Sequence, residues 1–204
     1  MIEIKSTSLT KHLKTLMDLD IVEREVPITE ENPEKSKRGL YKIKDNYLRF
    51  WFAFVYPNMS FIESGHSRMA MDKIRKNLVS GHIAYVYEDI CRERLWELNA
   101  DDVWSFHFTK LGRYWDAKTE IDIAAIDTED KNLILGECKY WQGPVGINVL
   151  REPEEKIKSV AWGQNRRKVW YVLFSVGGFT NDLKALAAER EDVQLFDGLE
   201  PKLY

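Results

Sequence analysis

The hydrophobic positions of the chain change their period several times, and each change marks a different kind of element. From Ser80 onward they predict, in order, a helix, three strands, a helix, a strand, a helix and a final short strand. The run "KVWYVLFSV" is continuously apolar, as expected of a buried central strand. The first helix lies in "SGHIAYVYEDICRERLWEL", and the positions expected to face inward are Ile83, Val86, Tyr87, Ile90 and Leu95. This part of the chain therefore predicts an α/β fold.

Residues 119–141, "TEIDIAAIDTEDKNLILGECKYW", predict two strands joined by a polar turn, but charged side chains interrupt their apolar runs. Because side chains alternate across a strand, Glu137 and Lys139 project from one face and Cys138 from the other, where it packs in the core. If the two strands pair through the turn, Asp122 comes opposite Glu137 or Lys139 on the same face. Two carboxylates and one ammonium then meet near one point.

Such a cluster has the composition of a site that cleaves phosphodiesters. Carboxylate oxygens bind Mg²⁺, the metal polarises a phosphoryl oxygen and activates water, and a lysine orients that water or stabilises the developing charge. We predict Asp122 and Glu137 as ligands of Mg²⁺, or of Mn²⁺, and Lys139 as the third catalytic group. The alternatives are a structural salt bridge at a sheet edge and a nuclease core that has lost its activity.

The first 79 residues predict a different organisation. In residues 1–47 a helix, a strand, a polar loop with "KSKRG" and a returning strand predict the second half of a winged helix. The exposed side chains Thr10, Lys11 and Lys14 of its helix would contact DNA, or a protein if the module serves assembly. Residues 48–79 predict an aromatic helix packed on both sides, followed by a polar connector from residue 63.

The strands around Asp122 and Glu137-Cys138-Lys139 resemble those of the PD-(D/E)XK nuclease superfamily. The resemblance implies a restriction-endonuclease-like core, in the order αβββαβ, within residues 80–204. It also implies that Glu88, in "YVYEDICRERL", joins the site as a catalytic and metal-binding residue. Asp122 departs from the pattern because it lies in "EID" and does not follow a proline, which the superfamily tolerates.

A narrower resemblance covers nearly the whole chain. The segments "YKIKDNYLRFWFAFVYPN", "YEDICRERL", "EIDIAAID" and "ILGECKYW" are similar to the C-terminal region of archaeal-type AAA-like ATPases. That resemblance implies a winged helix and a nuclease-like domain that follow a P-loop ATPase. The chain contains no G-x-x-x-x-G-K-[ST] motif, so we expect a C-terminal piece that begins inside the winged helix. DNA and a P-loop ATPase domain or subunit are the partners this implies.

Composition and charge narrow these expectations. With 44% hydrophobic and 12% aromatic residues, two cysteines and no long apolar run, the sequence predicts a folded cytoplasmic protein without membrane contact. Residues 80–204 carry 16 Lys and Arg against 22 Asp and Glu, so DNA binding there must depend on local basic patches. Arg166 and Arg167, just before the central strand, are candidates for phosphate contact, although ordinary surface residues have the same pattern.

Two functions from different classes follow from the sequence. The first is a Mg²⁺-dependent nuclease domain that acts on DNA through Asp122, Glu137, Lys139 and Glu88. The second is a non-catalytic DNA-binding or assembly module that serves an ATPase, with the aromatic segment and the acidic domain as its interaction surfaces. A fragment without activity is the third alternative.

Overall fold

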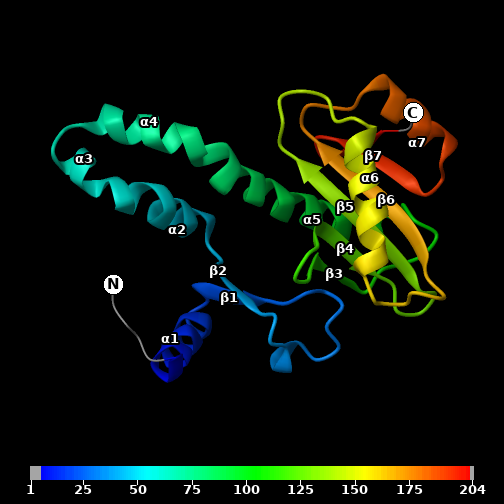
Figure 1. The fold of residues 1–204 in the computed structure, drawn as a ribbon, viewed down its shortest axis with the longest axis horizontal. Helices are drawn as coiled ribbons and strands as arrows, with labels where there is room; N and C mark the ends of the chain where they lie inside the picture. Colours follow the sequence, from blue (N-terminus) through cyan, green and yellow to red (C-terminus); the bar gives the residue numbers. More distant parts are fainter. Residues whose placement is uncertain (1–5, 203–204) are drawn as a thin grey trace. The chain divides into compact units, whose positions relative to one another are not determined.

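A computed structural model describes residues 6–202 of the chain and divides it into two compact units (Figure 1). The first unit comprises Met1–Val26 with Asn32–His82, and the second comprises Pro27–Glu31 with Ile83–Tyr204. We had expected boundaries after residues 47 and 79, whereas the observed division falls after His82. Each unit is described separately below.

The first unit begins with the predicted order of helix, strand, loop and strand. Helix α1 (Ser6–Asp18) precedes the strands β1 (Val22–Glu25) and β2 (Leu40–Ile43), which pair antiparallel. The guanidinium of Arg24 donates hydrogen bonds to the carbonyl oxygens of Pro33 and Ser36, at 2.7 and 2.5 Å. This side chain therefore holds the loop between the two strands.

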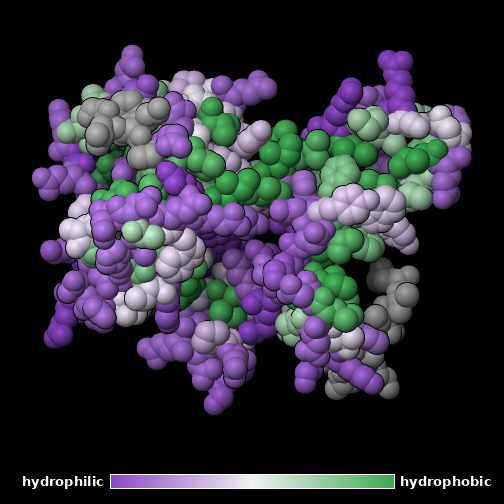
Figure 2. All heavy atoms as spheres, turned by 180° about the vertical axis from the view of Figure 1, so that it is seen from behind, coloured by the Kyte–Doolittle hydropathy of each residue, from purple (hydrophilic) through white to green (hydrophobic). Residues whose placement is uncertain are grey.

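The aromatic segment of the first unit is helical, but it is not packed on both sides as we had expected. The side chain of Phe54 is buried, whereas Tyr47, Phe52 and Tyr56 are exposed. Hydrophobic surface remains visible among the helices of this unit (Figure 2). The helical elements are α2 (Asn46–Phe50), the π-helix η2 (Trp51–Val55), the 3₁₀-helix η3 (Tyr56–Asn58) and α3 (Met59–Glu63).

The segment from residue 63, expected as a polar connector, is mostly helical. Helix α4 (Ser67–Leu78) buries Ala70 and Ile74, one turn apart, and is followed by the π-helix η4 (Val79–Ile83). The ammonium of Lys73 lies 4.3 Å from the ring centre of Phe61 in α3. The buried side chains of Ala70 and Ile74 and the cation–aromatic contact of Lys73 thus give this charged helix a packed face.

The second unit is built on a six-stranded sheet in the order β3-β4-β5-β6-β7-β8. The first three strands form an antiparallel meander, β5, β6 and β7 are parallel, and β8 is antiparallel to β7. The predicted order of helices and strands is confirmed, except that β8 was not predicted. The strands are β3 (Lys110–Trp115), β4 (Glu120–Ile126), β5 (Asn132–Lys139), β6 (Lys168–Ser175), β7 (Val193–Asp197) and β8 (Glu200–Lys202).

Helices cover both faces of this sheet (Figure 1). Helix α5 (Ala84–Ala100) packs on one face, and α6 (Ile147–Lys156) and α7 (Asn181–Glu189) pack on the other. Alternate residues of β5 supply the two cores: Leu133 and Leu135 face α6, and Ile134 and Cys138 face α5. The prediction that Cys138 packs in the core is therefore confirmed.

The buried positions of α5 differ in part from the expectation. In α5 the side chain of Ile90 is 39% exposed, and Cys91 and Leu98 join Tyr87 and Leu95 in the core. Helix α6 begins at Ile147, so Pro153 lies inside it and not in its first turn. The upstream residues extend the helix because Val149 and Leu150 are buried against the sheet.

A short segment that we had assigned to the N-terminal loop belongs to the second unit. The backbone N–H of Ile28 donates a 2.9 Å hydrogen bond to the carbonyl of Arg113 in β3. Its side chain packs against the core between the sheet and α6. A Cβ added at Gly112 would lie 3.3 Å from Cδ1 of Ile28, so the two residues are close neighbours. Among the described residues, no helix is long and apolar enough to cross a membrane.

Candidate functional site

The candidate site lies where β4 and β5 separate. Their paired register ends at Ile123 and Gly136, whereas β5 continues to pair with β6 up to Lys139. On its other side β4 contains a bulge, because Gly112 pairs with Ala124 but Tyr114 pairs with Ile121. Asp122 thus sits at the bulge and at the fork, a position where bulges commonly redirect a side chain.

Side chains bind the backbone groups that the fork leaves without strand partners. The carbonyl of Asp122 accepts a 2.8 Å hydrogen bond from Nη1 of Arg92 in α5. Its carboxylate Oδ2 accepts a 3.0 Å hydrogen bond from the backbone N–H of Cys138 in β5. The direction of the Asp122 side chain is therefore set by the fork and not by strand alternation alone.

Glu137 is the most deeply buried charged group of the site, with a side chain that is 3% exposed. Its Oε2 accepts a 2.8 Å hydrogen bond from Nζ of Lys139, as the spacing of two residues along β5 predicts. Its Oε1 accepts a 2.6 Å hydrogen bond from Nζ of Lys156, which comes from α6. Glu152, also in α6, has Oε2 at 3.9 Å from both ammonium groups.

Lys156 and Glu152 were not identified from the sequence. The only signal is the pair Glu152 and Lys156 at a spacing of four residues, which is common on exposed helix faces. Nothing in that spacing indicates a contact with β5. Their place in the site follows from the packing of α6 over the sheet.

Two features of the fork, its burial and the closeness of its carboxylates, change the pKa of Asp122. Burial, followed by the nearby carboxylate of Glu137, raises the pKa of Asp122 to about 6, although the Cys138 N–H and Lys139 act in the opposite direction. Burial lowers the pKa of Lys139, but Glu137 and Asp122 more than compensate, so this pKa lies above its usual range.

Glu88 lies in α5, the helix that covers the other face of the sheet. Its side chain is 13% exposed, and its Oε2 lies 3.9 Å from the guanidinium groups of both Arg92 and Arg113. Burial, followed by repulsion from Asp122, raises the pKa of Glu88 to about 7 against the effect of the two arginines. The structure thus places Glu88 within electrostatic range of Asp122 but in an arginine-lined environment.

The structure limits how a metal ion could be held. In the part of the chain that the structure describes, no group of three or more His, Cys, Asp or Glu side chains could hold a metal ion. The ligand set that we predicted, Asp122, Glu137 and Glu88, is therefore not assembled as a group of three. Two carboxylates remain, which suits Mg²⁺ because this ion usually keeps several waters and binds through one or two carboxylates.

The residues predicted to contact nucleic acid differ in their surroundings. Thr10, Lys11 and Lys14 are exposed on α1 in the first unit, and Arg166 is exposed before β6. Arg167 is different, because its guanidinium donates hydrogen bonds to backbone carbonyl oxygens of the preceding segment. These are the carbonyls of Ile157, Val160 and Trp162, at 2.8, 2.6 and 2.6 Å. The prediction of a phosphate contact for Arg167 is therefore corrected to a structural role.

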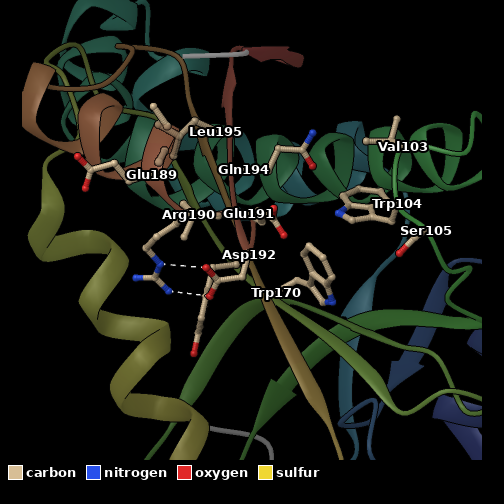
Figure 3. A pocket seen from close by; sticks show the side chains of 14 residues that line it. Val103, Trp104, Ser105, Trp170, Glu189, Arg190, Glu191, Asp192, Gln194 and Leu195 are labelled. Atoms are coloured by element: carbon tan, nitrogen blue, oxygen red, sulfur yellow. Dashed lines mark hydrogen bonds and ion pairs between the residues drawn. The ribbon is translucent and has the colours of Figure 1, made fainter.

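A pocket of about 630 Å³ lies at the other end of the sheet, away from these carboxylates. It is lined by residues from the start of β6 and from the turn between α7 and β7, whereas Glu137 and Lys139 pair with the end of β6. Trp104 and Trp170 form one side, and Arg190 is held by Asp192 on the other (Figure 3). This pocket is separate from the candidate site.

Comparison with known families gives one match over the middle of the chain. Residues 51–157, which are 107 of the 204 residues, match the family described as "DUF234: Archaea bacterial proteins of unknown function". The matched region contains helix α5, strands β3, β4 and β5 and helix α6, and ends at the next residue, Ile157. It therefore includes Glu88, Asp122, Glu137, Lys139 and Lys156.

Two individual proteins are also similar. The chain is 38% identical over 136 residues to an uncharacterized protein of Methanocaldococcus jannaschii, and the match covers 67% of this chain but 30% of that relative. A crystal structure of a repair endonuclease from Pyrococcus abyssi aligns with a TM-score of 0.30 and 21% identity. That alignment covers 45% of this chain and 40% of the endonuclease.

Proposed function

Taking as our premise that this chain belongs to the DUF234 family of archaeal and bacterial proteins of unknown function, we propose that residues 80–204 form a nuclease domain. The domain would have a restriction-endonuclease-like core of the PD-(D/E)XK type and hydrolyse phosphodiester bonds in DNA. The observation that carries the proposal is the pair Asp122 and Glu137. Their carboxylates meet at the fork of two strands, where burial and then the nearby carboxylate of Glu137 raise the pKa of Asp122.

Buried carboxylates that repel one another are stabilised by a bound cation. Desolvation makes each negative charge costly, and a divalent ion between them reverses the sign of the local field. Asp122 and Glu137 would hold a Mg²⁺ or Mn²⁺ ion, with water and substrate oxygens as its other ligands. When bound, the ion would polarise a phosphoryl oxygen and lower the pKa of a coordinated water.

The remaining groups of the site have complementary roles in this proposal. Lys139 lies 2.8 Å from Glu137, so its ammonium would orient the attacking water or stabilise the charge that develops on the phosphate. The Cys138 N–H fixes the direction of the Asp122 carboxylate. Glu88 would add negative potential without binding the ion directly, because two arginines surround its carboxylate.

The first unit would bring DNA to this domain. Its helix α1 and hairpin β1–β2 have the order of elements of a partial winged helix, and Thr10, Lys11 and Lys14 lie exposed on the helix. The two units together would form the C-terminal part of a larger ATPase, or a partner subunit of one. Binding by this chain alone would be weak and sensitive to salt, because few basic side chains take part.

A specific observation favours a second function, a non-catalytic assembly module. Both oxygens of Glu137 already accept hydrogen bonds from lysines, which is the pattern of a structural ion-pair network. The exposed side chains Tyr47, Phe52 and Tyr56 would then provide the surface for a partner. This alternative predicts no divalent cation at the fork.

The experiment that tests the proposal is nicking of supercoiled plasmid DNA with Mg²⁺ or Mn²⁺. We expect the Lys139→Ala variant to cleave at least about 100-fold more slowly than the wild type, as loss of a charge-stabilising group implies. Lys110→Ala is the matched control, because Lys110 is exposed on β3, in the same sheet. Equal cleavage by the wild type and Lys139→Ala, or no cleavage by either, would leave the assembly module as the better account.

A further inference from the structure

Lys156 differs from an ordinary surface lysine because its ammonium contacts a buried carboxylate. Its side chain leaves helix α6 and reaches the buried Glu137, with 2.6 Å between Nζ and Oε1. The distance from Lys139 to the other oxygen is 2.8 Å. Each oxygen of this carboxylate is therefore occupied by its own ammonium group.

A divalent cation cannot share that arrangement unchanged. Mg²⁺ binds oxygen at about 2.0–2.1 Å, closer than either ammonium, so an ion and an ammonium on one oxygen would repel each other strongly. Binding at Glu137 therefore requires one of the two lysines to move. Lys139 is held in place by the strand that carries it and has a side chain that is 16% exposed. Lys156 is more accessible, at 28%.

Helix α6 offers Lys156 another partner. Glu152 lies four residues earlier on the same helix, its Oε2 is 3.9 Å from Nζ of Lys156, and its side chain is 42% exposed. A small rotation of a flexible lysine side chain would exchange the buried carboxylate for the exposed one. A pair at this spacing is a favourable arrangement on a helix.

We propose that Lys156 is an internal counter-ion, which occupies Glu137 in the absence of metal and moves to Glu152 when a divalent cation binds. The inference depends on the proposed function, because it assumes that Glu137 is a ligand of the ion. It assigns Lys156 a positioning role that sets how tightly the ion binds. The ammonium pairs with the buried carboxylate and holds its orientation until the ion replaces it.

The test is titration of the full chain with Mn²⁺ alone, followed by calorimetry. Lys156→Met keeps most of the side-chain volume but removes the competing charge, so we expect about tenfold tighter Mn²⁺ binding than in the wild type. Lys158→Met is the matched control, because Lys158 is exposed two residues further along and loses the same charge. The control is expected to change the affinity less than about twofold.

A double-mutant cycle tests the role of Glu152. Glu152→Gln removes the alternative partner, so it should weaken Mn²⁺ binding when Lys156 is present and have a smaller effect in Lys156→Met. Equal effects in both backgrounds would show that Glu152 acts on the ion directly and would overturn the exchange.

A measurement on the unmodified chain covers the case in which Lys156→Met does not fold. With ¹³C-labelled lysine side chains, addition of Mg²⁺ should shift the Cε resonance of Lys156 and leave that of Lys158 unchanged. If the wild type binds Mn²⁺ but Lys156→Met binds no more tightly, or the resonance does not move, the inference is wrong and the nuclease proposal stands. If neither protein binds Mn²⁺, both are wrong.

Discussion

The backbone N–H of Cys138 donates a 3.0 Å hydrogen bond to the carboxylate of Asp122, across the point where β4 and β5 stop pairing. The bond replaces a strand-to-strand contact by a strand-to-side-chain contact. It fixes the carboxylate beside Glu137, and burial followed by this proximity raises the pKa of Asp122 to about 6. The local fold thus brings together two charges that are unfavourable for its own stability.

The free energy of unfolding of the metal-free protein should depend on pH because of these two carboxylates. The pKa of Asp122 is higher in the folded chain than its ordinary value of 3.8, so folding favours the protonated form. The resulting stabilisation is complete below pH 4 and is lost as the pH rises through about 6. Asp122→Asn is neutral and its amide oxygen can still accept from Cys138. At pH 8 it should raise the free energy of unfolding by about 2 kcal/mol.

Urea denaturation at pH 8 and pH 5, in the presence of a chelator, measures this effect. The difference between Asp122→Asn and the wild type should shrink at the lower pH. Asp130→Asn, at an exposed position in the turn after β4, is the control and should change stability by less than about 0.5 kcal/mol. A destabilised Asp122→Asn at pH 8 would show that the carboxylate is not under electrostatic stress.

Divalent metal binding should depend on pH over a defined range. Asp122 and Glu88 have pKa values raised to about 6 and about 7, and protons on these groups weaken the attraction for a cation. Mn²⁺ affinity should therefore rise through pH 6 to 7 and level off above pH 8. Between pH 7.5 and pH 5.5 the affinity should fall at least about fourfold, because binding must displace the proton of Asp122.

Calorimetric titrations at four pH values would establish this profile, with Glu88→Gln as the informative variant. Glutamine removes the group with the higher pKa, so the profile should become flatter near pH 7 and keep its slope near pH 6. A profile that does not change with pH in the wild type would contradict binding at Asp122.

Much of this arrangement could be predicted from the sequence because it depends on short-range rules. The two-residue period of a strand places Glu137 and Lys139 on one face and Cys138 in the opposite core, and the structure agrees. The order of helices and strands after Ser80 follows from hydrophobic period alone. Both predictions depend only on residues close together in the sequence.

The parts that could not be predicted depend on contacts between distant elements. The bulge at Asp122 arises from how β3 pairs with β4, and strand alternation cannot indicate it. Lys156 enters the site because Val149 and Leu150 bury α6 against the sheet. For the same reason helix α4 was expected as a connector. Its sequence has few hydrophobic residues to indicate a buried face, whereas in the fold Ala70 and Ile74 are buried.

Arg166 and Arg167 are neighbours in sequence but should respond differently to substitution. Arg167 holds three backbone carbonyls of the segment between α6 and β6, so Arg167→Met should lower the free energy of unfolding by about 2–3 kcal/mol. Arg166 is exposed, and Arg166→Met should leave stability within about 0.5 kcal/mol of the wild type.

A DNA-binding measurement further distinguishes a phosphate contact by Arg166 from a structural role of Arg167. If Arg166 contacts phosphate, Arg166→Met should weaken binding to a fluorescent duplex and reduce its salt dependence. Arg167→Met should affect binding only as far as it unfolds the domain. Stability that is lost equally in both variants would contradict the structural assignment of Arg167.

Gly136, directly before Glu137, shows how little space the fork allows. It pairs with Ile123 of β4 on one side and Val172 of β6 on the other. A Cβ at this position would lie 2.4 Å from Cγ2 and 2.6 Å from the carbonyl oxygen of Val172. Because the second of these atoms belongs to the backbone of a buried strand, a side-chain rotation cannot relieve the clash. Gly136→Ala should therefore lower the free energy of unfolding by about 2–3 kcal/mol.

Chemical denaturation with Gly143→Ala as the control tests this expectation, because nothing lies within 4 Å of a Cβ at that glycine. The control should stay within about 0.5 kcal/mol of the wild type. Gly136→Ala should also weaken Mn²⁺ binding, since a displaced β5 would move Glu137 relative to Asp122. Unchanged stability would mean that β5 and β6 can separate without cost, and the close approach of the strands would then not be what positions the two carboxylates.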